Sequence, residues 1–367
     1  MSEADLILYI VVGTALAFDF TNGFHDTANV VATSISTRAM SPRLAVTYAA
    51  ILNFAGAFIS LEVAATVAKD VVVADAITPT VVFAGLVGAI TWNLITWYFG
   101  LPSSSSHALI GGVVGAAFVA IGSEAVLSDG IIGKVLAPAL IAPILAFVVG
   151  GIAIVVCYRV VGRQRPGSVT RGFRSGQVIS GGLLALAHGT NDAQKTMGII
   201  ALALIASGEL GAGSDPPLWV IVSAATAIAL GTYMGGWRII RTMGTRIIKM
   251  DAAQGFSAQG AGSAVILAST HFGYPLSTTH VISGAVMGAG AGKRVSAVRW
   301  GVAGNMVTAW LLTLPAAGAI GAAAYGLTHL FGDGAVGPVL ITTAGLVAVG
   351  MAFARRMRAG ALAASAG

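Results

Sequence analysis

Residues 22–29 read Asn-Gly-Phe-His-Asp-Thr-Ala-Asn, and this polar stretch lies inside an apolar run from about residue 6 to residue 36. An ionised carboxylate at the centre of a membrane costs at least about 2.5 to 3.5 kcal/mol on insertion scales. Asp26 and Asp19 both lie in this run, so neither is an ordinary surface residue. The stretch predicts a membrane helix with a functional polar centre.

The composition extends this interpretation to the whole chain. Its 367 residues are 56% hydrophobic and only 9% charged, with a mean hydropathy of +0.87, which excludes a soluble globular protein. We expect an all-α, polytopic membrane protein with about 10–12 transmembrane helices, because each span needs about 20 apolar residues. Apolar runs fall at 6–36, 44–68, 79–99, 105–122, 135–158, 176–206, 218–236, 255–272, 276–291, 300–330 and 336–354. The short runs 105–122 and 276–291 are candidates for re-entrant hairpins.

The positive charges predict the orientation of these spans. With the N-terminus outside, most Lys and Arg residues fall in inner loops, as the positive-inside rule requires. The net charge of +6 is therefore topological, and we expect no nucleic acid as a partner. The first run lacks a basic segment before it and a cleavage site after it, so we expect it to remain as a span. The expected location is the cell (inner) membrane, as a multi-pass protein.

The polar motifs occur twice and in the same order. The stretch at 22–29 is echoed by His-Gly-Thr-Asn-Asp-Ala-Gln-Lys at 188–195, and Pro-Ser-Ser-Ser-Ser-His at 102–107 by Pro-Leu-Ser-Thr-Thr-His at 275–280. Five crossings separate the two copies, which predicts the inverted repeats of secondary transporters. The expected divisions are a first repeat with flanking helices at 1–158, a basic cytoplasmic linker at 159–175, a second repeat at 176–330, and a C-terminal helix and basic tail at 331–367.

Within each repeat the polar residues share one helical face, since they recur at spacings of three, four and seven. Gly23 and Gly189 lie among them and are expected to break the helix and release carbonyl groups toward a cation. These faces carry Asp19, Asn22, Asp26 and Asn29 in the first copy, and His188, Asn191, Asp192 and Lys195 in the second. The candidate cation-coupling residues are Asp19, Asn22, His25, Asp26, Asn191 and Asp192, and His188 is a candidate for supporting them from behind.

The second motif of each repeat resembles a helix start. Proline suits the first turn, hydroxyl groups cap, and free N–H groups point outward, so two such helix starts that face each other could enclose a tetrahedral anion. The candidate hydroxyls are Ser104, Ser105, Ser106, Ser277, Thr278 and Thr279. Each of them could equally bond its own backbone. His107 and His280 could either support the site from behind or serve only in packing.

Together with residues 92–107, these motifs resemble the inorganic phosphate transporter (PiT) family, specifically its bacterial low-affinity, proton-coupled branch. The resemblance extends to about residue 330. It implies a symporter, commonly a homodimer, that imports inorganic phosphate with protons or sodium, and in this branch as a neutral complex with a divalent metal ion. By this resemblance Asp26 and Asp192 match the paired family aspartates, and the hydroxyls named above bind the anion. Asn53 stands where many relatives have glutamate, which leaves open its part in the cation path.

The balance of charges makes a coupled cation necessary, since each negative charge that enters against an inside-negative potential costs about 2.3 kcal/mol per 100 mV. We expect Asn29 and Lys195 to contact phosphate. When the two repeats are aligned, His25 matches Asn191 and Lys195 matches Asn29, so each pair has one amide and one group that can become positive. Groups that can become positive favour protons over sodium. The sequence does not indicate which residues would bind a metal ion, and no cofactor is expected.

Other functions remain open from the sequence alone. Sulfate or another tetrahedral oxyanion could replace phosphate, and sodium could replace protons. A passive anion channel is a third possibility, although acidic residues in the path favour bound cations. An intramembrane Ser/His/Asp hydrolase has only the serines beside His107 and His280 in its favour, and no nucleophile elbow is present. We therefore expect a transporter and not an enzyme.

Overall fold

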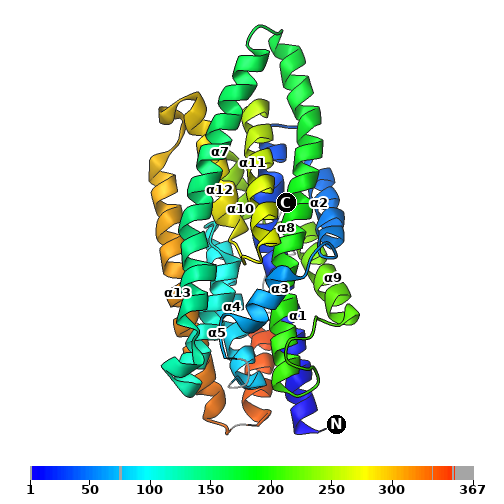
Figure 1. Cartoon of the computed structure of the whole chain (residues 1–367), viewed down its shortest axis with the longest axis vertical. Coiled ribbons are helices and arrows are strands. Elements are labelled where there is room, and N and C mark those ends of the chain that lie inside the picture. Colours follow the sequence, from blue (N-terminus) through cyan, green and yellow to red (C-terminus); the bar gives the residue numbers. More distant parts are fainter. Residues whose placement is uncertain (1, 74–76, 333, 349–350, 352–367) are drawn as a thin grey trace, which may run out of the picture.

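The computed structural model describes residues 2–73, 77–332, 334–348 and 351, and nearly all of them are helical (Figure 1). Among these residues no β-strand occurs, and Val72 and Val126 form an isolated bridge. The all-α prediction is confirmed. The main helices are α1 (Glu3–Ser36), α2 (Pro42–Gly56), α3 (Glu62–Lys69), α4 (Pro79–Phe99), α5 (Ser105–Ile121), α7 (Ala137–Val161), α8 (Pro166–Ala206), α9 (Leu218–Met234), α10 (Trp237–Arg241), α11 (Ala252–His271), α12 (Thr278–Lys293) and α13 (Trp300–His329). Shorter turns of helix are α6 (Ser128–Gly130), the π-helices Ile131–Leu136 and Thr242–Arg246, and a helix at Val336–Ala348.

Several of these helices are long and apolar enough to cross a membrane. Four meet this test among the described residues, and a fifth does if α9 and the bent segment after it form one span. The multi-pass membrane protein is thus supported, while the number of about 10–12 spans stays a prediction. Helix α8 carries His188, Asn191, Asp192 and Lys195, which lower its hydropathy, and α12 has only 16 residues.

One predicted span is broken, and another is followed by a sharp bend. The run at 44–68 forms α2 and α3 with a gap between them, and α9 meets the Trp237–Arg246 segment at an angle of 59°. We expected the breaks at Gly23 and Gly189, and that expectation is wrong, because α1 and α8 continue through both. These glycines instead permit close helix contact. A Cβ on Gly23 would lie 2.4 Å from the Ile228 carbonyl oxygen, and one on Gly189 would lie 2.2 Å from that of Asn53.

The basic loops collect at one end of the molecule. Arg174 Nε donates to the Thr37 carbonyl at 2.9 Å, and the Arg299 amide donates to the Ile247 carbonyl at 3.0 Å. At the opposite end, the Ala335 amide donates to Glu3, near the N-terminus at the bottom of Figure 1. This separation fits the predicted topology. The expected basic tail with Arg355, Arg356 and Arg358 lies outside the described residues.

The helices that carry the duplicated motifs run in opposite directions. The end of α1 meets the start of α8, where Thr37 Oγ1 donates to Gln177 Oε1 at 2.9 Å. The start of α1 meets the end of α8, since Ala4 and Ser207 line one cavity. The packing is also duplicated: Gly111 and Gly115 of α5 contact α13, and Gly284 and Gly288 of α12 contact α7. This arrangement is consistent with inverted repeats.

Asp251 ties three helices together at the basic end. It caps α11, accepts from Tyr158 Oη of α7 at 2.6 Å, and pairs with Lys293 Nζ of α12 at 2.8 Å. Partial burial acts to raise the pKa of Asp251, but the hydrogen bonds from Lys293, Tyr158 and the Gln254 amide outweigh it and hold the pKa below its ordinary value. A lowered pKa means that this stabilisation is present above the unfolded-state value of about 3.9 and is lost as the pH falls through the folded-state value.

We therefore expect Asp251→Ala to lower the stability of the purified protein at pH 7 by about 0.5 to 2 kcal/mol, the usual loss for a missing cap. Asp251→Asn keeps a capping side chain and should lose less. Melting temperatures in detergent at pH 7 and below the folded-state pKa measure both effects. The difference between Asp251→Asn and the wild type should shrink at low pH, and a difference that grows would contradict this assignment.

Candidate functional site

The starts of α5 and α12 face each other in the middle of the molecule. Ser106 Oγ at the start of α5 donates to the Leu276 carbonyl just before α12 at 3.1 Å. Ser104 and Ser277 cap the two helices by accepting from the amides three residues further on, at 3.1 and 3.3 Å. The first amides of a helix have no acceptor within it, so each start offers free N–H groups and a positive dipole end. The predicted pair of facing helix starts is thus present.

Asp26 on α1 lies directly between these helix starts. Ser105 Oγ of α5 donates to its Oδ2 at 2.7 Å, and Thr279 Oγ1 of α12 donates to its Oδ1 at 3.3 Å. Asn29, about one turn further, donates from Nδ2 to Thr279 Oγ1 at 2.9 Å and to Thr278 Oγ1 at 3.3 Å. His25 Nδ1 lies 2.8 Å from Asp26 Oδ1. The first polar motif therefore touches the hydroxyls of both repeats.

Asp192 on α8 holds the matching position in the second repeat. Thr278 Oγ1 donates to its Oδ2 at 3.1 Å, and His188 Nε2 lies 3.0 Å from the same oxygen. Lys195 Nζ donates to Asp192 Oδ1 at 2.5 Å, to Ser106 Oγ at 2.5 Å and to the Leu276 carbonyl at 2.7 Å. Lys195 is only 1% exposed. Its ammonium group is therefore fixed at the meeting point of the two helix starts, where it offsets the charge of Asp192.

The two aspartates are close enough to share a cation. One ligand atom from each of Asp26, His188 and Asp192 lies within 4.8 Å of the others, and all three side chains are buried. Carboxylate oxygens with an imidazole suit a divalent cation, although the ammonium of Lys195 already occupies one oxygen of Asp192. The same centre thus offers anion donors and cation ligands side by side.

The remaining predicted residues lie around this centre. Asn191 Nδ2 donates to Thr270 Oγ1 of α11 at 2.8 Å. Asn53 lies at the end of α2, where its Nδ2 donates to Thr232 Oγ1 at 2.8 Å, and its backbone packs against Gly189. These contacts join α2 to α8 and α9, so Asn53 supports the packing of the helices. Asp19 and Asn22 are buried on α1, toward its N-terminal end.

His107 and His280 lie behind the helix starts. Their ring centroids are 4.8 Å apart, and His280 stacks on Trp310 of α13 at 4.1 Å. Both line an apolar cavity of about 560 Å³ between α7, α12 and α13. Their imidazoles contact each other and the tryptophan, which agrees with a packing or supporting role.

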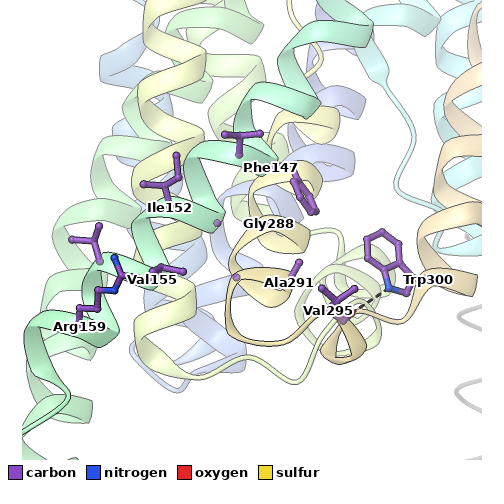
Figure 2. Close-up of a pocket in the computed structure, with 12 residues that line it drawn as sticks. Phe147, Ile152, Val155, Arg159, Gly288, Ala291, Val295 and Trp300 are labelled. Carbon is purple, nitrogen blue, oxygen red and sulfur yellow. Dashed lines mark hydrogen bonds between the residues drawn. The ribbon is translucent and has the colours of Figure 1, made fainter.

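Figure 2 shows a second cavity, of about 660 Å³, near the basic end of α7 and α12. Phe147, Ile152, Val295 and Trp300 are among its walls, and Arg159 is the charged residue in its lining. The indole Nε1 of Trp300 donates to the Val295 carbonyl at 3.2 Å. None of the predicted site residues lines this cavity, so its apolar walls do not form part of the candidate site.

Three threonines near the site were not predicted from the sequence. Thr96 on α4 lies with its Oγ1 3.0 Å from His25 Nε2, and Thr270 binds Asn191, as described above. Both occupy matching places in the two repeats, shortly before the glycine and proline that precede α5 and α12, and that repetition could have identified them. Thr196 on α8 faces Asp19, and no pattern in the sequence marked it.

Three kinds of similarity place this geometry among known proteins. A model of the phosphate transporter family matches residues 22–321. A Mycobacterium leprae protein named "Probable low-affinity inorganic phosphate transporter" is 57% identical over 89% of this chain and 79% of its own length. A Bacillus subtilis protein of the same name is 45% identical over 89% of this chain and 98% of its own length. The solved structure titled "The sodium-dependent phosphate transporter" has the same fold, with a TM-score of 0.80 and 24% identity over 88% of this chain and 99% of that one.

Proposed function

The chain belongs to the phosphate transporter family, and we propose that it imports inorganic phosphate across the cell membrane by secondary symport with protons. Its relatives are named as transporters, and we therefore propose no enzymatic function for this chain. The observation that carries the proposal is the meeting of the α5 and α12 starts around Asp26, Asp192 and Lys195. A transporter must bind its substrate between two halves that can move relative to each other, and this site is built from both repeats.

The helix starts supply the groups that an oxyanion needs. The amides of Ser105, Ser106, Thr278 and Thr279 lie in the first turns of α5 and α12 and have no acceptor in their own helices. The Lys195 ammonium adds a positive charge, and the Asn29 amide adds a donor. We assign phosphate to this space, with its oxygens facing the amides, the hydroxyls and Lys195.

The acidic groups supply the coupling. Asp26 and Asp192 both border the space for the anion, and their negative charges would repel a phosphate dianion unless cations accompany it. Protons, or a divalent metal ion held by Asp26, His188 and Asp192, would offset that repulsion. We favour protons because the imidazole of His25, a group that can exchange protons, contacts Asp26 directly, and because the nearby Lys195 ammonium repels sodium. Sodium coupling, with Asn22 and Asn191 as ligands, is the alternative.

Phosphate and sulfate differ in a way that this site can detect. Phosphate carries a hydrogen at neutral pH and can donate it to Asp26 or Asp192, whereas sulfate has no hydrogen to donate. A site built around a substrate hydrogen rejects analogues that lack it. In proteoliposomes that hold the purified protein, unlabelled arsenate should compete with uptake of radioactive phosphate, and sulfate should compete at least about 100-fold more weakly. Competition by sulfate as strong as that by arsenate would contradict phosphate as the substrate.

The hydroxyls should contribute to phosphate affinity. Ser105→Ala or Thr278→Ala removes a donor that a bound anion could use, and such bonds to charged groups are worth about 1.5 to 3 kcal/mol. We expect the apparent KM for phosphate to rise by about 10-fold to 150-fold in each variant. Thr308→Ala is a matched control, because its exposed hydroxyl bonds the Gly304 carbonyl of its own helix. An unchanged KM in both site variants would show that these hydroxyls serve only the structure.

By the same family resemblance, we propose that the protein works as a homodimer in the cell membrane. Mass measurement of the detergent-purified protein tests this expectation.

A further inference from the structure

Asp19 is a buried carboxylate that the network described above leaves without a partner. It lies on α1, about two turns before Asp26, and is 0% exposed. Neither of its oxygens has a hydrogen-bond partner among the described residues. Asp26 and Asp192, in contrast, each accept from hydroxyl groups and contact a histidine. Asp19 therefore differs in kind from the two aspartates of the repeats.

The polar groups that face Asp19 are uncharged. Asn22, about one turn further along α1, and Thr196 on α8 are its polar neighbours. Asn22 Oδ1 and Thr196 Oγ1 also lack a hydrogen-bond partner among the described residues. Together with the two oxygens of Asp19, these atoms form a cluster of four buried oxygens, and the donors nearest to Asp19 are the neutral Thr196 hydroxyl and Asn22 amide. Neutral donors do not balance the charge of a buried carboxylate, so an ionised Asp19 needs a positive partner.

The charges around Asp19 are few. Asp192 and Lys195, both on α8, are the charged groups that act on it. Helices α4 and α9 also pack against α1, and neither has a charged residue along its length. Lys195 is already bound to Asp192, Ser106 and the Leu276 carbonyl. No free cation of the protein is thus available to Asp19 in the described part of the chain.

The second repeat has no counterpart of Asp19. The repeat comparison that aligns Asp26 with Asp192 aligns Asp19 with Ala185, a small apolar residue on α8. A carboxylate that supported the symmetric anion site would be expected in both copies. A group that carries a coupling ion is needed only once, so the asymmetry favours that role.

From these observations we propose that Asp19 carries the co-transported proton, in a site formed with Asn22 and Thr196 and separate from the phosphate site. The proposal rests on the proposed proton symport and names the residue that performs it. A proton from the outer aqueous phase binds one Asp19 oxygen, and the same O–H bond breaks when the proton leaves to the inner phase. Protonation of Asp19 removes one negative charge near Asp192, which makes binding of the anion more favourable. Because this coupling is reciprocal, bound phosphate also favours protonation of Asp19.

Asp19→Asn tests the proposal, since asparagine resembles the protonated side chain but cannot release a proton. In proteoliposomes we expect this variant to exchange internal for external phosphate, and to lose accumulation driven by an inward proton gradient. Vesicles that hold a trapped pH-sensitive dye should show that phosphate entry acidifies the lumen for the wild type and not for Asp19→Asn. Asp129→Asn, a change at an exposed acid, should behave as the wild type in both assays.

Each other outcome overturns the proposal. Accumulation by Asp19→Asn at the wild-type level would remove Asp19 from the proton path, and loss of exchange as well would assign it to substrate binding or to the fold. If Asp19→Asn fails to fold, Asp19→Glu provides a second test, because it keeps a titratable group. Asp19→Glu should keep both phosphate accumulation and acidification of the lumen, and loss of either would contradict the proposal. Failure of the wild type itself to exchange phosphate would instead reject the proposed function, so the two failures are distinguishable.

Discussion

Asp26→Asn and Asp192→Asn should each abolish phosphate accumulation in proteoliposomes. Asparagine has nearly the same shape as aspartate and still accepts from Ser105 at the first position and from Thr278 at the second, so the helix starts should stay in place. It carries no negative charge, so it cannot balance a cation that accompanies phosphate at this site. We therefore expect loss of coupling with the protein still folded, as measured by initial rates and final levels of radioactive phosphate uptake.

The two variants should differ in stability. At Asp26 the neighbouring His25 can remain neutral, whereas Asp192→Asn leaves the buried Lys195 ammonium without its carboxylate. Loss of one partner of a buried ion pair costs about 3–5 kcal/mol. We thus expect a lower melting temperature for Asp192→Asn than for Asp26→Asn. Wild-type accumulation by either folded variant would remove that aspartate from the coupling path.

Lys195→Met should have the largest effect on phosphate binding. The lysine is buried between Asp192, Ser106 and the Leu276 carbonyl, and its ammonium group contacts the starts of both α5 and α12. Methionine has a similar length but no charge and no donor. We expect no saturable phosphate uptake in the accessible concentration range, measured as the concentration dependence of initial rates.

A double variant separates the charge on Lys195 from its role in stability. Asp192→Asn with Lys195→Met leaves no unpaired charge at this position, so its melting temperature should exceed that of either single variant. It should still fail to transport phosphate. If Lys195→Met kept a wild-type KM while folded, the ammonium would serve only to pair with Asp192.

Much of the helical arrangement could be predicted from the sequence. The apolar runs at 79–99, 105–122 and 300–330 match α4, α5 and α13 to within one residue at every end, because long apolar runs bounded by proline, glycine or charge have few alternatives. The facing starts of α5 and α12 followed from the repeated Pro-Ser and Pro-Leu-Ser motifs and their opposite orientation. Those features depend on local residue type and on one symmetry.

The breaks in the helices could not be predicted in the same way. Gly23 and Gly189 were expected to interrupt α1 and α8, yet each lies where a backbone of the other repeat packs against it, with Gly231 and Asn53 as the partners. A glycine in an apolar run permits either a break or a close contact, and only the packing of the neighbouring helix decides between them. The orientation of Thr196 toward Asp19 likewise depends on how two distant helices pair.

Accumulation of radioactive phosphate by the purified wild-type protein in sealed proteoliposomes tests the central claim most directly. The vesicles would start with equal phosphate inside and outside, an inward proton gradient, and no sodium. We predict that internal phosphate rises above the external level and returns to it when an uncoupler collapses the proton gradient. Accumulation that requires a sodium gradient at equal pH on both sides, or internal phosphate that never exceeds the external level, would contradict proton symport.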